Sequence, residues 1–336
     1  MSLMVKPGRY IRWRLRNAAS LSVWKVNMAQ PNKLSFGYRA KRDFKLNWFV
    51  YVLALFCLSY YFIFHYAPLS GLLIAFKNYK PTRGIWGSEW VGLMYFKQFF
   101  SSYYFTRVFR NTLLINLYDL LWGFPAPIIF ALLLNELSSN VYKRFVQTVT
   151  YLPYFISQVV ICGIMLNFLS SGGLFNQIIQ MLGGQSVLFM QNPSYFRTIY
   201  VASGIWQGVG YGTILYLSSL SAIDPQLLDA AAIDGCNRFR RVWHVTLPGI
   251  TPTIIIMLIL RMGNMMSVGF EKIILLYNPS IYETADVISS FVYRYGLLEG
   301  NFSYTTAVGL FNSVINFAML VVVNYISKRV SEVSLW

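Results

Sequence analysis

Charged residues and residues that could bind a metal ion are scarce in this chain of 336 residues. Only 12% of the residues are Asp, Glu, Lys or Arg, and the chain has three cysteines and two histidines. The cysteines, at positions Cys57, Cys162 and Cys236, show no paired spacing and form no Cys/His cluster. The sequence therefore predicts neither a disulfide framework nor a metal site.

The motifs of common catalytic sites are missing as well. No Gly-x4-Gly-Lys-Ser/Thr loop occurs, so the chain lacks the P-loop with which many proteins bind and hydrolyse ATP. No nucleophile–base pair and no pair of carboxylates has a spacing that suggests catalysis. Gly208, Gly210 and Gly212 follow no expected strand, and they indicate close helix packing rather than a dinucleotide site. We expect no catalytic residue and no cofactor in this chain.

Apolar residues, by contrast, make up 56% of the chain, and the mean hydropathy is +0.49. A helix needs roughly 20 apolar residues to cross a hydrocarbon core of ~30 Å. Six stretches qualify, at residues 47–67, 111–134, 148–169, 196–217, 248–270 and 304–326. The first is not a cleavable signal peptide, because residues 1–46 precede it and it lacks a small-residue cleavage site. The sequence predicts an all-α, polytopic membrane protein with six transmembrane helices.

Basic residues are concentrated before the first apolar stretch. Residues 1–46 contain 11 Lys or Arg and a single acid, Asp43. The positive-inside rule places this tail in the cytoplasm, and six crossings return the C-terminus to the same side. Residues 218–247 then lie in the cytoplasm, and the loops 68–110 and 271–303 lie outside. Long loops are largely exempt from the rule, so the basic residues of the first outer loop leave the assignment unchanged.

The net charge of +16 arises in large part from this N-terminal tail. Next to the anionic inner surface of a membrane, each Lys or Arg gains roughly 1 kcal/mol, so we expect a membrane partner and no nucleic acid. Residues 8–27 mix Tyr, Trp and Leu with arginines, which fits either an amphipathic helix in the membrane interface or an unstructured tail. We expect two parts, the basic tail 1–46 and a transmembrane domain 47–336.

A polar segment separates the fourth and fifth apolar stretches. Asp224-Pro225 is typical of a helix start, because Asp accepts hydrogen bonds from free backbone N–H groups and Pro suits the first helical position. The helix formers of residues 226–234 follow, and Gly235 supplies the left-handed conformation that ends a helix. A second short helix is expected at about residues 237–244.

The spacing within this segment closely resembles the EAA loop of permease subunits in ATP-binding-cassette (ABC) importers. The family pattern is Glu-Ala-Ala, three residues, Gly, nine residues and Ile-x-Leu-Pro. The matching positions here are Asp229-Ala230-Ala231, Gly235 and Val245-Thr246-Leu247-Pro248. Asp229 replaces Glu and Val245 replaces Ile. The Ala-Ile-Asp-Gly variant is similar to the carbohydrate-uptake branch, which includes the maltose and alginate transporter subunits, and further resemblance extends over residues 47–336.

The resemblance implies a type I ABC importer permease fold in which residues 218–247 are a coupling loop. Asp229 would contact a partner ATPase, Ala230 and Ala231 would allow its close approach, and Gly235 would form the turn to the second short helix. Leu247 and Pro248 would set the angle at which the loop joins the fifth transmembrane helix. The expected partners are a second homologous permease, two ATPase subunits that bind the ATP and magnesium, an extracytoplasmic solute-binding protein and a carbohydrate substrate. The expected location is the bacterial inner membrane.

Polar side chains inside the apolar stretches are candidates for a translocation path, because they are unfavourable in lipid. Arg261 is the clearest, since a cation at this depth should face a cavity, an acid or backbone carbonyls. Asn264 and Ser267 follow it on a similar side of the expected helix, and related sugar permeases place contacts in the fourth and fifth helices. The expected path residues are Trp206, Gln207, Gly208, Tyr211, Arg261, Asn264, Ser267 and Phe270, with Asp119, Asn312 and Asn316 as weaker candidates. Each of them could instead bridge helices within the bundle.

Three other functions compete with carbohydrate import. An ion-coupled secondary transporter needs buried carboxylates or broken-helix ion sites, and only Asp119 lies within an apolar stretch. A membrane-embedded enzyme needs clustered acids or histidines at one membrane face, and the sequence has no such cluster. A permease of the same family that imports a non-sugar solute, such as an amino acid or phosphate, is the closest competitor.

Overall fold

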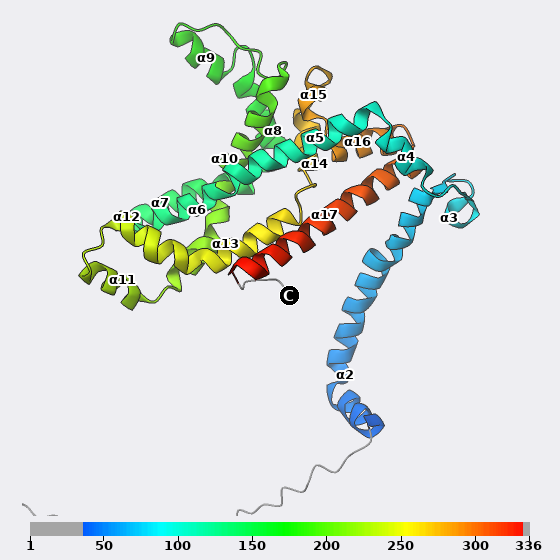
Figure 1. Cartoon of the computed structure of the whole chain (residues 1–336), viewed down its shortest axis with the longest axis horizontal. Coiled ribbons are helices and arrows are strands. Elements are labelled where there is room, and N and C mark those ends of the chain that lie inside the picture. The colour runs from blue at the N-terminus through cyan, green and yellow to red at the C-terminus, as the bar shows by residue number, and fades with distance from the viewer. Residues whose placement is uncertain (1–35, 332–336) are drawn as a thin grey trace, which may run out of the picture. The chain divides into compact units, whose positions relative to one another are not determined.

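The computed structural model describes residues 36–331, and nearly all regular structure in this range is helical (Figure 1). The contacts divide the chain into two units, the first up to Ser70 and the second from Gly71 onward. We describe each unit by itself. The basic segment 8–27, for which an amphipathic helix or an unstructured tail was expected, lies outside the described residues.

The first unit consists mainly of one long helix. Its elements are α2 (Phe36–Tyr61), η1 (Phe62–Tyr66) and the start of η2 (Ala67–Phe76). Helix α2 is kinked at Asn47, where φ is −115°, so the kink falls where the first apolar stretch was expected to begin. From Lys41 to Ser70 every side chain is exposed. A helix that is apolar and exposed on all sides is suited to hydrocarbon surroundings.

The second unit is a helical bundle with one small hairpin. The hairpin pairs β1 (Lys77–Asn78) antiparallel with β2 (Glu89–Trp90), and α3 (Gly84–Gly87) lies between the two strands. The elements from the hairpin to the polar segment 222–246 are α4 (Met94–Phe100), α5 (Tyr103–Tyr118), η3 (Asp119–Gly123), α6 (Pro125–Asn135), α7 (Asn140–Tyr151), η4 (Leu152–Phe155), α8 (Gln158–Leu169), α9 (Leu174–Met181) and α10 (Pro193–Ser221). Those that follow are α11 (Pro225–Ile233), α12 (Arg238–Arg241), η5 (Val242–Thr246), α13 (Leu247–Met262), α14 (Phe270–Leu276), η6 (Pro279–Ile281), α15 (Tyr282–Ala285), α16 (Ile288–Val292), η7 (Tyr293–Leu298) and α17 (Phe302–Ser331).

Five helical segments of the described chain are long and apolar enough to cross a membrane. They are Lys41–Phe76, Tyr103–Asn135, Gln158–Met181, Arg238–Met262 and Phe302–Arg329. The fourth expected span, residues 196–217, falls within α10. This helix has 29 residues, a length of about 44 Å at 1.5 Å per residue, but it is more polar than the other five. The all-α membrane architecture is thus confirmed; five of the six expected spans have both the length and the composition for a crossing, and α10 has the length only.

The first expected span contains the π-helical turn η1, and three others also differ from regular, continuous α-helices. The second contains a π-helical turn, η3, followed by Pro125. The third, expected at 148–169, is interrupted at η4 by Pro153, and Ser157 then caps α8. Proline has no N–H and its ring collides with the preceding helical turn, so such breaks are expected beside it.

The fifth expected span, residues 248–270, is wrong at its C-terminal end. Helix α13 stops at Met262, and residues 263–269 form turns and irregular chain before α14 begins at Phe270. The backbone N–H of Met266 donates to the side-chain oxygen of Asn316 on α17, at 2.7 Å. Because that side chain supplies an acceptor outside the helix, the chain leaves the helical path here. Asn264 and Ser267 therefore do not share a helix face with Arg261, as the sequence suggested.

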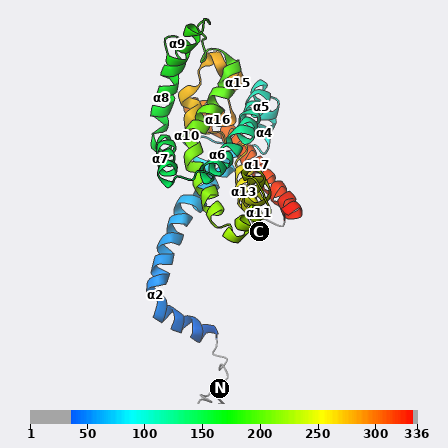
Figure 2. The same cartoon turned by 90° about the vertical axis from the view of Figure 1, so that its left-hand side faces the viewer.

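Helix α10 lies at the centre of the second unit (Figure 2), where it packs against α5, α6, α7 and α13. One buried cluster joins α6, α10 and α13 through residues such as Ile128, Tyr216 and Ile250. Another joins α4, α5, α16 and α17 around Phe99 and Phe291. One cluster therefore holds α5 and the other holds α6. Some of the polar residues described below lie on the stretch of chain between these two points.

The contact of α10 with α7 depends on Gly210. A Cβ atom on this residue would overlap the backbone carbonyl of Thr150, whereas a Cβ on Gly208 would meet no atom within 4 Å. We expect Gly210→Ala to lower the free energy of unfolding by about 1–3 kcal/mol, because overpacking against backbone forces the helices apart. Gly208→Ala is the matched control and should change it little. Thermal unfolding of both purified variants in detergent tests this, and equal stability would contradict the packing role.

Candidate functional site

The segment between α10 and α13 has the local structure that its sequence predicts. The side chain of Asp224 accepts a hydrogen bond from the N–H of Gln226 (2.9 Å), with Pro225 at the first position of α11. Gly235 has a φ of +73°, and the N–H of Cys236 donates to the carbonyl of Ala231 (3.0 Å). This is the left-handed helix end that a glycine favours.

Helix α11 presents an apolar and acidic surface to its surroundings. Asp229 and Ala230 are exposed, whereas Ala231 is only 7% exposed and faces its own chain. Of the two alanines expected to allow a close approach, Ala230 alone is thus accessible. Ile233 at the end of α11 is 86% exposed and Phe239 on α12 is 80% exposed, so each short helix of the segment carries a large exposed apolar side chain. Exposed apolar residues rimmed by polar ones are typical of a protein interface, and the sequence analysis did not single these two out.

The second short helix is not separate from the following span. The end of α12 continues into η5 and then into α13, with Leu247 at the start of α13 and Pro248 next to it. Arg241 forms an ion pair with Glu136 at the end of α6 (3.0 Å). The helical segment from Arg238 to Met262 is continuous, with the π-helical turn η5 and Pro252 inside it.

A polar cavity of about 580 Å³ lies between α5, α8, α10 and the chain that follows α13. Expected path residues that line it are Gln207, Arg261, Asn264, Ser267 and Phe270. Its other lining residues, which the sequence analysis left out or ranked lower, include Asn116, Asp119, Gln158, Tyr200, Glu271 and Lys272. The lining thus carries two cations, two acids, four amides and two aromatic rings, which can bind hydroxyls, carboxylates and the C–H face of a sugar ring.

The ion-paired residues Arg261 and Asp119 line this cavity and also a second one of about 540 Å³. Gly204 and Asn264 also line both cavities, and the second is otherwise apolar and includes Gly208. Arg261 belongs to the last turn of α13, and Asp119 begins the π-helical turn η3. The sequence predicted that Arg261 faces a cavity, an acid or backbone carbonyls. The structure shows that the acid is Asp119.

Lys272 closes one side of the first cavity. Its side chain is 7% exposed, its Nζ donates to the carbonyl of Tyr200 (2.8 Å), and it lies 4.6 Å from the centre of that ring. The hydroxyl of Tyr200 accepts from the N–H of Gly269 (3.1 Å). Lys272 thus fixes the start of α14 to Tyr200 on α10, and Gly269 fixes the end of the irregular chain to the same residue. The sequence analysis missed Lys272. The only signal there is that a cation follows directly after the apolar stretch 248–270.

Two expected path residues lie outside both cavities. Trp206 and Tyr211 are each 43% exposed, and neither lines a cavity described above. The ring of Tyr211 stacks on that of Tyr154 in η4, with centroids 3.8 Å apart and planes at 3°. Within residues 36–331, no three His, Cys, Asp or Glu side chains lie close enough to hold a metal ion.

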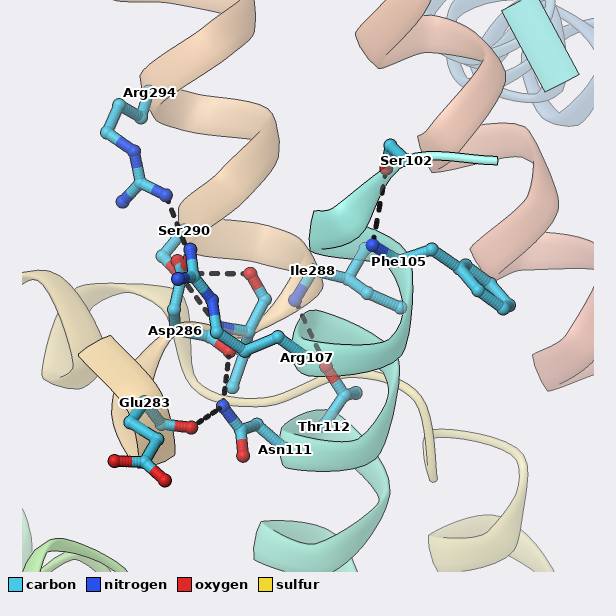
Figure 3. A network of polar contacts seen from close by, with 11 residues as sticks. Ser102, Phe105, Arg107, Asn111, Thr112, Glu283, Asp286, Ile288, Ser290 and Arg294 are labelled. Carbon is cyan, nitrogen blue, oxygen red and sulfur yellow. Dashed lines mark hydrogen bonds and ion pairs between the residues drawn. The ribbon is translucent and has the colours of Figure 1, made fainter. Parts of the chain in front are cut away.

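A buried acid joins α5 to α16 near the N-terminal end of α5 (Figure 3). Asp286 is fully buried and pairs with Arg107 (2.7 Å) and Arg294 (2.8 Å), while Ser290 donates to its other oxygen (2.9 Å). The amide nitrogen of Asn111 donates to the carbonyls of Glu283 (2.8 Å) and Asp286 (3.0 Å). Burial alone would lower the pKa of Arg294, but the hydrogen bond and charge of Asp286 raise it above its ordinary value.

Comparison with known families assigns this arrangement of helices. The sequence profile described as "binding-protein-dependent transport system inner membrane component" matches residues 123–332. The chain belongs to this family. It is an ABC importer permease, as the sequence predicted, and hence a multi-pass component of the inner membrane.

Two proteins of Bacillus subtilis (strain 168) are similar to this permease over most of their length. Protein LplB is 44% identical over 297 residues, which are 88% of this chain and 92% of LplB. The polygalacturonan/rhamnogalacturonan transport system permease protein YteP is 40% identical over 84% of this chain and 89% of YteP.

Solved structures extend the similarity to three dimensions. A chain in the crystal structure of a bacterial ABC transporter involved in the import of the acidic polysaccharide alginate matches with a TM-score of 0.82 and 40% identity. The match covers 87% of this permease and 99% of that chain. The alginate ABC transporter in complex with an alginate pentasaccharide-bound periplasmic protein gives the same TM-score, at 39% identity and 88% coverage.

Proposed function

We propose that this permease carries a saccharide of several sugar units across the inner membrane. The observation that carries the proposal is the polar cavity of about 580 Å³, which brings amides, charges and aromatic rings together within a lipid-exposed helical bundle. A cavity of this size falls within the range of small-molecule sites, about 300–1,000 Å³. The relatives named for polygalacturonan, rhamnogalacturonan and alginate support a saccharide rather than another solute.

The permease works in this proposal as one half of a pair. A second, homologous permease completes the path, and the exposed rings of Trp206 and Tyr211 are available to it or to the sugar. The loops 68–110 and 271–303 lie outside, where they meet a solute-binding protein loaded with the substrate. Both termini and residues 218–247 lie in the cytoplasm.

ATP hydrolysis takes place on partner ATPase subunits, one of which receives α11. Asp229 accepts hydrogen bonds from that subunit, Ala230 permits its approach, and Gly235, Leu247 and Pro248 hold the angle of the segment. Because α12, η5 and α13 form one continuous helix, a push on α11 moves the far end of α13. Arg261 lies at that end, paired with Asp119, and both residues line the two cavities. Displacement of α13 therefore pulls this pair apart and joins the cavities.

The decisive measurement is ATPase activity of the assembled transporter in proteoliposomes, with a panel of oligosaccharides, an amino acid and phosphate. We expect stimulation by an oligosaccharide together with the binding protein, and uptake that stops without ATP. Stimulation by the amino acid or phosphate alone would assign the permease to a non-sugar branch. Uptake driven by an ion gradient without ATP would indicate a secondary transporter instead.

A further inference from the structure

A third cavity, of about 530 Å³, lies where α5 and α10 begin, next to α15. Three arginines line it, Arg107, Arg110 and Arg197, together with Asn111 and the acid Glu283. We refer to it as the arginine cleft. Neither the coupling segment nor the two cavities around Arg261 include any of these five residues.

The charges of the arginine cleft are not balanced within the described chain. Asp286 neutralises part of the positive charge, but it is already shared between Arg107 and Arg294. Within residues 36–331, Arg110 and Arg197 form no ion pair, and Arg197 instead donates to the side-chain oxygen of Asn111 (2.9 Å). Glu283 is the one acid among the lining residues, so an unpaired positive charge remains.

Two guanidinium nitrogens at the arginine cleft also lack a partner. The Nε atoms of Arg107 and Arg197 are buried and form no hydrogen bond. A buried donor without an acceptor is unfavourable by roughly 1–3 kcal/mol, and more when it carries charge. Like charges held close together are unfavourable too. An anion held by Arg110 and Arg197 would relieve the repulsion between these like charges, and guanidinium groups match the planar fork of a carboxylate.

The arginine cleft and the polar cavity of about 580 Å³, referred to here as the central cavity, are lined by neighbouring turns of the same two helices. On α5, Asn111 lines the cleft, while Ile115 and Asn116, about one turn further, line the central cavity. On α10, Arg197 lines the cleft, and Tyr200, just under one turn further, lines the central cavity. Residues three or four apart lie on one side of a helix, as do Asn111 with Ile115 and Arg197 with Tyr200. A chain-like ligand can therefore extend from one cavity into the other along the same faces.

We infer that the arginine cleft binds the carboxylate of an acidic sugar unit, at the mouth of the path, before that unit enters the central cavity. This inference rests on the proposed saccharide import and narrows its substrate to a saccharide that carries uronate groups. Arg110 and Arg197 are the groups that meet the carboxylate. Arg107 and Asn111 are positioning residues, since their principal partners belong to the chain itself.

The test uses the assembled transporter and its binding protein in proteoliposomes, with two probes of equal length. One is trigalacturonate and the other is its carboxyl-reduced, neutral counterpart. In Arg110→Gln and Arg197→Gln, we expect KM for trigalacturonate uptake to rise about tenfold or more, the effect of losing one charge-assisted hydrogen-bonding group. KM for the neutral probe should stay within about twofold. Arg83→Gln, an exposed arginine of the loop 68–110 outside the cleft, is the matched control and should change neither value.

Every other result contradicts one specific part of the inference. An unchanged KM for trigalacturonate in both variants means that the cleft does not contact the substrate. An equal loss for both probes means that the arginines receive an acidic side chain of the binding protein and not the sugar. A wild-type transporter that imports the neutral probe and rejects trigalacturonate keeps the proposed function but refutes the acidic substrate. A wild-type transporter that imports no saccharide at all refutes the proposed function itself.

Discussion

Gly235→Asp is expected to abolish uptake while the permease still folds and inserts into the membrane. Gly235 has a φ of +73°, and a Cβ atom there would meet no atom within 4 Å. Asp tolerates the left-handed conformation better than most residues, so the chain itself has room for the new side chain. That side chain projects from the end of α11 into the space that we assign to the ATPase.

The expected loss is large because the added carboxylate would be buried against a partner without a matching charge. An uncompensated buried charge is unfavourable by about 3–5 kcal/mol, which corresponds to a fall in uptake to roughly one-hundredth or less. Gly300→Asp is a matched control, since Gly300 has a φ of +75°, also meets no atom within 4 Å and also follows an acid. We expect Gly300→Asp to retain uptake.

Cross-linking from Cys236 separates a docking defect from a folding defect. This cysteine is partly exposed next to Gly235, Cys162 is buried, and Cys57 can be replaced by serine. In the Cys57→Ser background, Cys236 should cross-link to the ATPase subunit, and Gly235→Asp should lose the cross-link while its amount in the membrane stays unchanged. Normal uptake by Gly235→Asp, or the absence of a cross-link from the unaltered segment, would refute the coupling role.

The parts of the structure that the sequence predicts correctly depend on short-range interactions. Asp224, Pro225 and Gly235 each act on the few residues beside them, so the bounds of α11 follow from local rules. The apolar stretches predict membrane helices for a similar reason, because the bilayer requires length and composition and no particular neighbour.

The parts that it predicts poorly depend on residues far apart in the chain. The end of α13 was placed eight residues too late because Asn316, 50 residues from Met266, accepts its N–H. The side of α10 that faces the cavities follows from packing against α6 and α13. Gln207 and Gly208 lie on that side and Trp206 does not, although all three were proposed together.

The network around Asp286 shows this limit most clearly, since Arg107 precedes Asp286 by 179 residues. In the sequence both lie in loops where charged residues are ordinary, and nothing there indicates that they meet. Only the fold reveals that one fully buried acid joins α5, through Arg107, to the chain around α16 (Figure 3). Removal of the Asp286 carboxylate is therefore expected to lower the free energy of unfolding more than Gly210→Ala does.

Asp286→Ala should lower the free energy of unfolding by about 3–5 kcal/mol, because it leaves two largely buried arginines without their shared acid. Arg107 and Arg294 are 22% and 18% exposed, so water can solvate them only in part. The raised pKa of Arg294 means that its positive charge is favoured in the folded protein by the acid that the substitution removes. Chemical or thermal unfolding of the purified permease in detergent measures the change.

Glu136→Ala is the matched control, since it also removes an acid from an arginine. The pair of Arg241 with Glu136 is a single contact whose side chains are 30% and 23% exposed, so we expect its loss to be about 1 kcal/mol or less. Asp286→Ala should therefore be several-fold more destabilising than Glu136→Ala. If both variants have the same free energy of unfolding, Asp286 does not hold α5 to α16. In that case Asp286 does not position Arg107 and Asn111 in the arginine cleft either.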